Sequence, residues 1–103
     1  MFVIDLNYIV PLEEIDGHMK EHVIFLNKYY KKNIFIASGR KVPRTGGIIL
    51  ALGESAEQIA AVMDEDPFCV HNLATYSITE FLTSQSNPDL KKLLEKWKAG
   101  LTA

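Results

Sequence analysis

The sequence predicts a small α+β domain in which the elements follow the order β-α-β-β-α-β, with one more helix at the end. Four short hydrophobic segments have the length of strands. A longer segment after the first of them repeats hydrophobic residues at intervals of three and four, and a capping pattern opens a second helix. The chain has 103 residues, which is enough for one hydrophobic core but not for two.

The first strand is predicted at residues 2–9, where side chains alternate between two faces. One face carries Asp5 and Asn7, which are unfavourable in strands, so this face is expected to be polar or to line a cavity. Pro11 ends the strand. The opposite face consists of Phe2, Ile4, Leu6 and Tyr8.

Residues 12–32 predict one continuous amphipathic helix of about five to six turns. Gly17 lies inside this helix and costs up to about 1 kcal/mol relative to alanine, which burial of the apolar stripe has to offset. Asn33 is expected to stop the helix. The stripe consists of Leu12, Ile15, Met19, Val23, Leu26 and Tyr30.

The second and third strands are predicted on either side of a polar loop. Residues 34–37 form a short strand that ends at Ser38 and Gly39, and residues 40–46 form the loop. Residues 47–52 are apolar on both faces, as is typical of a central strand.

A capping box predicts the start of the second helix, with Ser55 at the cap and Gln58 three residues later. This helix is expected to run to about Glu65 and to be stopped by Pro67. The fourth strand is predicted at residues 74–82.

This order is the split βαβ pattern of ferredoxin-like folds. Right-handed crossovers would place the first and third strands in the centre of an antiparallel sheet and both helices on one of its faces. The other face would expose Val3, Ile9 and alternate residues of the third strand, which together are too apolar to stay in water. We therefore expect a homodimer that forms through the open sheet face.

The chain is expected to divide into a domain at residues 1–83 and a tail at residues 84–103. The tail begins as a linker, and Asn87 and Pro88 then open an amphipathic helix that Gly100 should stop. A short helix is marginal by itself in water, so it should dock on its own domain or on a partner subunit. Its apolar stripe consists of Leu90, Leu93, Leu94 and Trp97.

Composition narrows the class of protein. The net charge of −2 gives no general reason to bind nucleic acid or an anionic membrane, and no hydrophobic run approaches the length of a membrane span. The first residues read as a strand and not as a signal peptide. The single cysteine, Cys69, rules out an internal disulfide and fits a reducing compartment, so a cytoplasmic location is expected.

His22 and Asp66 are the candidate catalytic residues. His22 lies seven positions after Ile15 and four before Leu26, which puts its imidazole on or beside the buried stripe of the first helix. Asp66 ends the second helix on the same side of the sheet. A carboxylate that accepts a hydrogen bond from one ring nitrogen would fix the tautomer and leave the other nitrogen free for proton transfer. The alternative is a structural histidine capped by a carboxylate.

The sequence gives less support to metal binding and to thiol chemistry than to proton transfer. His18 and His22 are four residues apart and could share a metal, with His71 as a possible third ligand, but no recognised metal-binding spacing is present. We therefore expect neither a metal nor an organic cofactor. Cys69 is expected to be a buried, inert thiol.

A basic segment could attract an anionic substrate. Residues 31–44 contain five lysines or arginines and no acidic residue. Ser38, Gly39 and Arg44 flank the end of the second strand within this segment and are candidate substrate-binding residues. The alternative is a solvated loop.

A set of segments is distinctive when taken together, namely the opening strand, His22 with Phe25 and Leu26, residues 37–39, residues 43–50, and Asp66 with Pro67 and Phe68. Through these segments the chain resembles the YciI-like, or YCII-related, proteins over about residues 1–82. The resemblance implies a dimeric α/β barrel of ferredoxin-like subunits and an active site built on a His-Asp pair, which maps onto His22 and Asp66. It also implies that Ser38 and Gly39 border the cleft, and that any reaction is proton abstraction or elimination on small, often aromatic, ring compounds.

Two function hypotheses follow. The first is a small dimeric lyase or isomerase in which His22 is the base, Asp66 orients it, and Ser38, Gly39, Arg44 and Phe68 contact the substrate. The second is a non-catalytic module that binds a small molecule or serves dimeric interaction, for which protonation of His22 would not matter.

Overall fold

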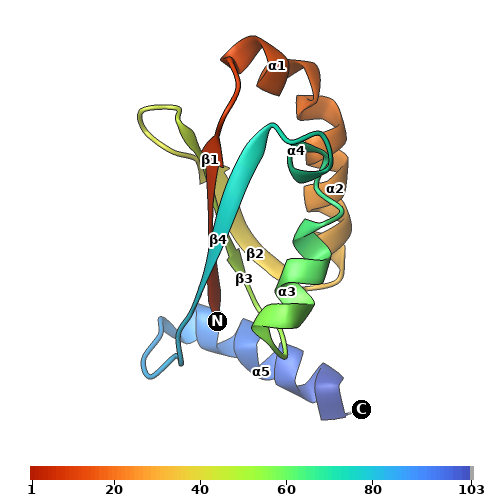
Figure 1. The fold of residues 1–103 in the computed structure, drawn as a ribbon. Coiled ribbons are helices and arrows are strands. Elements are labelled where there is room, and N and C mark those ends of the chain that lie inside the picture. Colours follow the sequence, from red (N-terminus) through yellow and green to blue (C-terminus); the bar gives the residue numbers. More distant parts are fainter. Residues whose placement is uncertain (103) are drawn as a thin grey trace.

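A computed structural model describes residues 1–102 of the chain, with side chains described as far as Trp97 (Figure 1). The elements confirm the predicted order, although the first predicted helix is divided in two and a further short helix follows the second. They are β1 (Phe2–Tyr8), α1 (Leu12–Gly17), α2 (Met19–Lys31), β2 (Phe35–Arg40), β3 (Gly46–Ala51), α3 (Ala56–Met63), α4 (Pro67–Val70), β4 (Ala74–Glu80) and α5 (Pro88–Thr102).

The four strands form one antiparallel sheet in the order β2-β3-β1-β4. The first and third strands are therefore central, as predicted. Helices α1 to α4 lie on one face of this sheet, and the opposite face carries no helix (Figure 1). This is the ferredoxin-like arrangement that the order of elements predicts.

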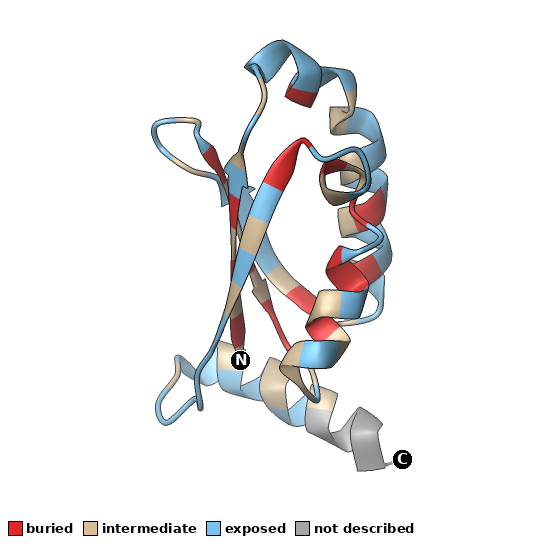
Figure 2. Ribbon diagram, in the orientation of Figure 1, coloured by how far each residue is buried: buried red, intermediate tan, exposed pale blue. Residues whose placement is uncertain are grey.

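The hydrophobic core lies between the sheet and its helices. The apolar face of β1 contributes Phe2, Ile4 and Leu6, which are at most 2% exposed. Figure 2 shows buried positions along the strands and along the helices that cover them. The core is completed from the other elements by Ile15, Phe25, Tyr29, Phe35, Ile49, Ala51, Ile59, Val62, Met63, Phe68, Leu73 and Ala74.

The prediction of one continuous helix at residues 12–32 is wrong. α1 ends at Gly17, and His18 separates it from α2 with φ −113° and ψ 6°, outside the helical region. Glycine has the largest backbone entropy to lose in a helix, so the break occurs where helical propensity is weakest. Asn33 follows α2 with φ 58°, a left-handed conformation that asparagine tolerates, and it ends the helix as predicted.

β2 is longer than predicted. Ser38, Gly39 and Arg40 continue the strand because each lies opposite a residue of β3 in the antiparallel register. Ser38 and Arg40 are two positions apart in one strand, so they share one face of the sheet. β4, in contrast, ends at Glu80 and not at residue 82.

The open face of the sheet is only partly apolar. Val3 lies opposite Leu50 in the β1–β3 register, and both are half-buried. Next to them Asp5 forms an ion pair with Lys41, which also donates to Asn7 Oδ1 at 2.8 Å. The edge strand β4 adds polar side chains to this face.

α5 crosses the end of the sheet at which the chain begins (Figure 1). Asn87 Oδ1 accepts a hydrogen bond from the Asp89 amide at 2.9 Å, which confirms the predicted cap. The helix continues to Thr102, so Gly100 does not stop it as predicted. Together with Met1, Leu52 and residues of the linker, Leu94 and Trp97 line a cavity of about 600 Å³.

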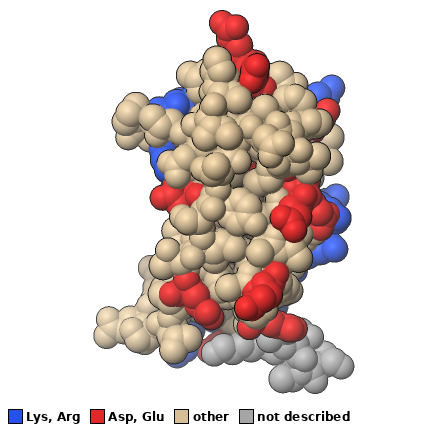
Figure 3. Space-filling view, in the orientation of Figure 1, with Lys and Arg blue, Asp and Glu red and all other residues tan. Residues whose placement is uncertain are grey.

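No described helix is both long enough and apolar enough to span a membrane. The face seen in Figure 3 is mostly uncharged, with acidic and basic side chains in small, separate groups. A net charge of −2 is consistent with this mixed surface.

Candidate active site

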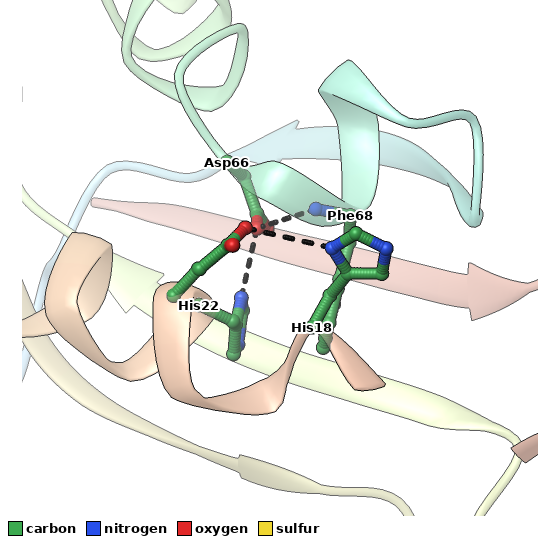
Figure 4. Close-up of polar contacts among 5 residues, drawn as sticks. His18, His22, Asp66 and Phe68 are labelled. Carbon is green, nitrogen blue, oxygen red and sulfur yellow. Dashed lines mark hydrogen bonds and ion pairs between the residues drawn. The ribbon is translucent and has the colours of Figure 1, made fainter. Parts of the chain in front are cut away.

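His22 and Asp66, 44 positions apart in the sequence, meet between α2 and α4 (Figure 4). The local sequence explains the position of Asp66. An aspartate followed by proline is well suited to begin a helix, because Asp66 is the N-cap of α4 and Pro67 is its first residue. His22 Nδ1 lies 2.8 Å from Asp66 Oδ1.

The hydrogen bond determines which nitrogen of His22 carries the proton. An ionised carboxylate can only accept hydrogen bonds, so Nδ1 is the donor and the neutral ring has its lone pair on Nε2. Asp66 Oδ1 also accepts from the Phe68 amide at 3.0 Å. Asp66 Oδ2 is buried and has no hydrogen-bond partner among the described residues. The acceptor role of Asp66 is thus concentrated on a single oxygen.

The ring of Phe68 packs against the face of the His22 imidazole. The two rings are stacked, with centroids 4.0 Å apart and an angle of 8° between their planes. Phe68 is buried in the core, and it also forms an edge-to-face contact with the ring of Tyr8, with centroids 6.0 Å apart. The His22 side chain is 13% exposed, whereas Asp66 is fully buried. The imidazole of His22 therefore has limited access to solvent, whereas the carboxylate of Asp66 has none.

A cavity of about 310 Å³ lies beside the His22–Asp66 pair. It opens between α2 and the helix-facing side of β1, β2 and β3. Most of the lining side chains are apolar or aromatic, which is typical of a site for a small organic molecule. The lining residues are Leu6, Tyr8, Met19, His22, Val23, Leu26, Ser38, Gly39, Arg40, Gly47, Ile48, Ile49 and Phe68.

Three of the predicted substrate-binding residues line this cavity with His22, namely Ser38, Gly39 and Phe68. Ser38 is fixed by a neighbour that the sequence did not suggest, because its Oγ lies 2.5 Å from the hydroxyl of Tyr30 on α2. A fixed hydroxyl is a suitable contact for a substrate oxygen.

Arg44, the fourth predicted residue, is not among those that line the cavity. Its guanidinium is paired with Asp16 at 2.5 Å, and this contact raises the pKa of Arg44 and lowers the pKa of Asp16. Arg40 lines the cavity instead, and it forms no ion pair with any described residue. The alternation of side chains along a longer β2 would have identified Arg40, because it shares a face with Ser38.

Cys69 and the other two histidines lie outside this arrangement. Burial, with a smaller contribution from the Asp66 carboxylate, raises the pKa of the Cys69 thiol to about 12, which supports its interpretation as inert. His18 does not join His22 in a shared site. Its ring lies against that of His71, with centroids 4.4 Å apart.

The chain is similar to a known protein family and to a solved structure. A family model, described as the YCII-related domain, matches residues 1–82. One similar solved structure is 5-chloro-2-hydroxyhydroquinone dehydrochlorinase (TftG) from Burkholderia phenoliruptrix AC1100, in complex with 2,5-dihydroxybenzoquinone. The match has a TM-score of 0.67 and 16% sequence identity, and it covers 82% of this chain and 96% of that one, which shows a shared fold. A search of curated proteins finds no significant match.

Proposed function

The chain belongs to the YCII-related domain family, and from this premise we propose that it is a small lyase or isomerase that uses His22 as a general base. The observation that carries the proposal is the hydrogen bond to a buried carboxylate from Nδ1 of His22, whose side chain lines a cavity. That bond leaves the basic nitrogen, Nε2, on a side chain that lines the cavity.

The proposed reaction begins when Nε2 removes a proton from an acidic C–H or O–H group of the substrate. The electron pair of the broken bond moves into the substrate, and His22 becomes an imidazolium. Asp66 stabilises this cation through the hydrogen bond from Nδ1, and the face of Phe68 adds a cation–π contribution. The electron pair then either expels a leaving group, which is an elimination, or takes the proton back at another atom, which is an isomerisation.

We propose that the substrate is a small, flat, anionic ring compound. The aromatic rings of Tyr8 and Phe68 and the apolar side chains around them favour a planar apolar body. Ser38 and Arg40 lie on β2 and can bind ring oxygens. The structural neighbour is named as a dehydrochlorinase of a hydroxylated, chlorinated ring. Loss of HCl from such a ring needs a base and a leaving group, as in the step proposed for His22.

The first experiment uses the two ring compounds named for that neighbour. We expect the chain to bind 2,5-dihydroxybenzoquinone in isothermal titration calorimetry and to release chloride from 5-chloro-2-hydroxyhydroquinone. Binding should perturb the NMR signals of the His22 ring, whose proton should be found on Nδ1. The proposed role of His22 as base would be contradicted if its ring carried the proton on Nε2. It would also be contradicted if no ring compound in a wider panel changed the NMR signals of the His22 ring.

Arg40 should contribute to affinity, and Arg44 should not. The acidic hydroxyl groups of 2,5-dihydroxybenzoquinone make it anionic at neutral pH, so Arg40→Ala should raise its Kd about three- to tenfold, as expected for one partly solvated ionic hydrogen bond. Arg44→Ala is the matched control, because the guanidinium of Arg44 already forms an ion pair with Asp16. Calorimetric titration of both variants measures the effect. A larger effect for Arg44 would assign anion binding to the residue that sequence alone suggested.

We also propose that two copies of the chain associate through the open sheet face. Val3 and Leu50 are apolar residues of this face, and no helix of the sheet's own domain covers it. Leu50→Glu should yield monomers of 11.6 kDa in size-exclusion chromatography with light scattering, because a carboxylate is costly to bury in an interface. Lys20→Glu, on the exposed surface of α2, should leave the dimer intact. A monomeric wild type would contradict the proposal.

One observation favours a second function, that of a non-catalytic binding module. Asp66 caps α4 through the Phe68 amide, so its burial also has a purely structural explanation. In such a module the ring compounds would bind but would not react, and replacement of His22 would change only their affinity.

A further inference from the structure

A second contact joins α2 to the segment after α4, and it involves the two histidines that the proposed reaction does not use. His18 stands at the start of α2, one turn before His22 (Figure 4), and His71 follows the last residue of α4. Their rings lie with centroids 4.4 Å apart and planes tilted by 32°. Glu21, on the next turn of α2, brings a carboxylate oxygen to 3.5 Å from His18 Nδ1.

These three side chains have the composition and spacing of a metal-binding set. One ligand atom from each lies within 4.8 Å of the others. In a tetrahedral zinc site with bonds of about 2.0–2.1 Å, neighbouring ligand atoms are about 3.4 Å apart. Glu21 and His71 are exposed, so small rotations of their side chains can close the remaining distance. We propose that His18, Glu21 and His71 bind a divalent transition metal, with zinc as the best fit.

The ligand types select the class of metal. Two imidazoles and one carboxylate suit zinc and its neighbours in the transition series, whereas magnesium and calcium require oxygen ligands. Three protein ligands leave a fourth position of a tetrahedral site for water or another small ligand. The 3.5 Å contact between His18 and Glu21 is at the outer limit of a hydrogen bond, so a metal would displace little existing interaction.

Neighbouring donors do not compete for this metal. His22 already gives its Nδ1 to Asp66, and the Cys69 thiol is not among the ligand atoms that lie within 4.8 Å of one another. The metal would join the start of α2 to the end of α4, and these two elements position His22 and Asp66. Binding should therefore raise the melting temperature of the domain. The site does not depend on the proposed catalytic function.

The test is a calorimetric titration of the full chain with zinc ions, after treatment with a chelator. We expect one zinc ion per chain and a higher melting temperature by circular dichroism. Magnesium should have neither effect. His71→Ala and Glu21→Gln should each weaken zinc binding at least about tenfold, because even the loss of an outer partner of a metal ligand costs that much. Glu14→Gln, a change of the same kind on α1, should bind zinc as the wild type does.

His22→Ala distinguishes this site from the alternative pair of His18 and His22 on one helix. We expect the variant to retain zinc affinity. The proposal is overturned if the wild type does not bind zinc, or if His71→Ala binds it as tightly as the wild type. It is also overturned if zinc binding is lost in His22→Ala and retained in His71→Ala. NMR spectra of the His18, His22 and His71 rings, recorded with and without zinc, show independently which rings bind the metal.

Discussion

Replacement of His22 by alanine should lower kcat about 10²–10⁴-fold, the usual contribution of a histidine general base. The assay is chloride release from 5-chloro-2-hydroxyhydroquinone, or turnover of whichever ring compound the panel identifies. Alanine removes the imidazole, and the described residues that line the cavity include no other histidine and no carboxylate to take the proton in its place. Because the deleted ring leaves space beside Phe68, added imidazole should restore part of the activity.

The fold should survive this change with reduced stability. Asp66 would keep the hydrogen bond from the Phe68 amide but lose the one from His22, and a hydrogen bond to a charged group contributes about 1.5–3 kcal/mol. Thermal unfolding monitored by circular dichroism measures this loss and shows that kcat refers to folded protein. Lys20→Ala, an exposed position on the same helix, is the matched control and should retain full turnover. If His22→Ala turned over substrate like the wild type, His22 would be a structural residue.

The meeting of His22 with Asp66 could be foreseen because local patterns fix both positions. Helical spacing placed His22 next to the buried stripe, and Pro67 placed Asp66 at the end of the second predicted helix. In the structure Asp66 is instead the N-cap of α4, directly after that helix. The ferredoxin-like order then required both helices to pack on one face of the sheet. The stacking of Phe68 on the imidazole was not foreseen, because ring geometry depends on tertiary packing and not on sequence spacing.

The substrate-binding residues show where local reasoning fails. Arg44 was predicted to bind substrate because it lies near the end of a strand. In the structure it forms an ion pair with Asp16 of α1, and the prediction had joined α1 to α2 in one helix. Arg40 was treated as part of a loop, because pairing with β3 extends the strand beyond its hydrophobic residues. Both errors have one physical origin. Cross-strand hydrogen bonds and helix breaks depend on partners that are distant in the sequence.

The break between α1 and α2 has a consequence for chemistry. In a continuous helix His18 and His22 would lie one turn apart on the same face, and they could have shared a ligand. Because His18 stands outside the helical region, its ring meets His71 instead, while His22 turns to Asp66. A weak helical position at Gly17 thus separates two histidines into two different environments.

Replacement of Asp66 by asparagine should lower kcat about 10–100-fold, with a small change in stability. The structure predicts the orientation of the new amide. Oδ1 already accepts from both the His22 ring and the Phe68 amide, so a flipped side chain would point its NH₂ group at the Phe68 N–H donor. Asparagine should therefore keep its oxygen towards His22, and the ring should keep its proton on Nδ1. What is lost is the negative charge that stabilises the imidazolium, and a hydrogen bond to a charged group contributes about 1.5–3 kcal/mol.

Two measurements on Asp66→Asn distinguish a change in the tautomer of His22 from the loss of the negative charge on residue 66. The NMR shifts of the His22 ring nitrogens should show the proton still on Nδ1, while steady-state kinetics show the expected fall in kcat. Asp66→Ala, which removes both the acceptor and the α4 cap, should lower kcat further and also lower the melting temperature. A proton on Nε2 with a loss near 10⁴-fold would mean that the amide had flipped and the wrong tautomer prevailed. An unchanged kcat in Asp66→Asn would mean that Asp66 acts only as a helix cap, and that the base at His22 needs no charged partner.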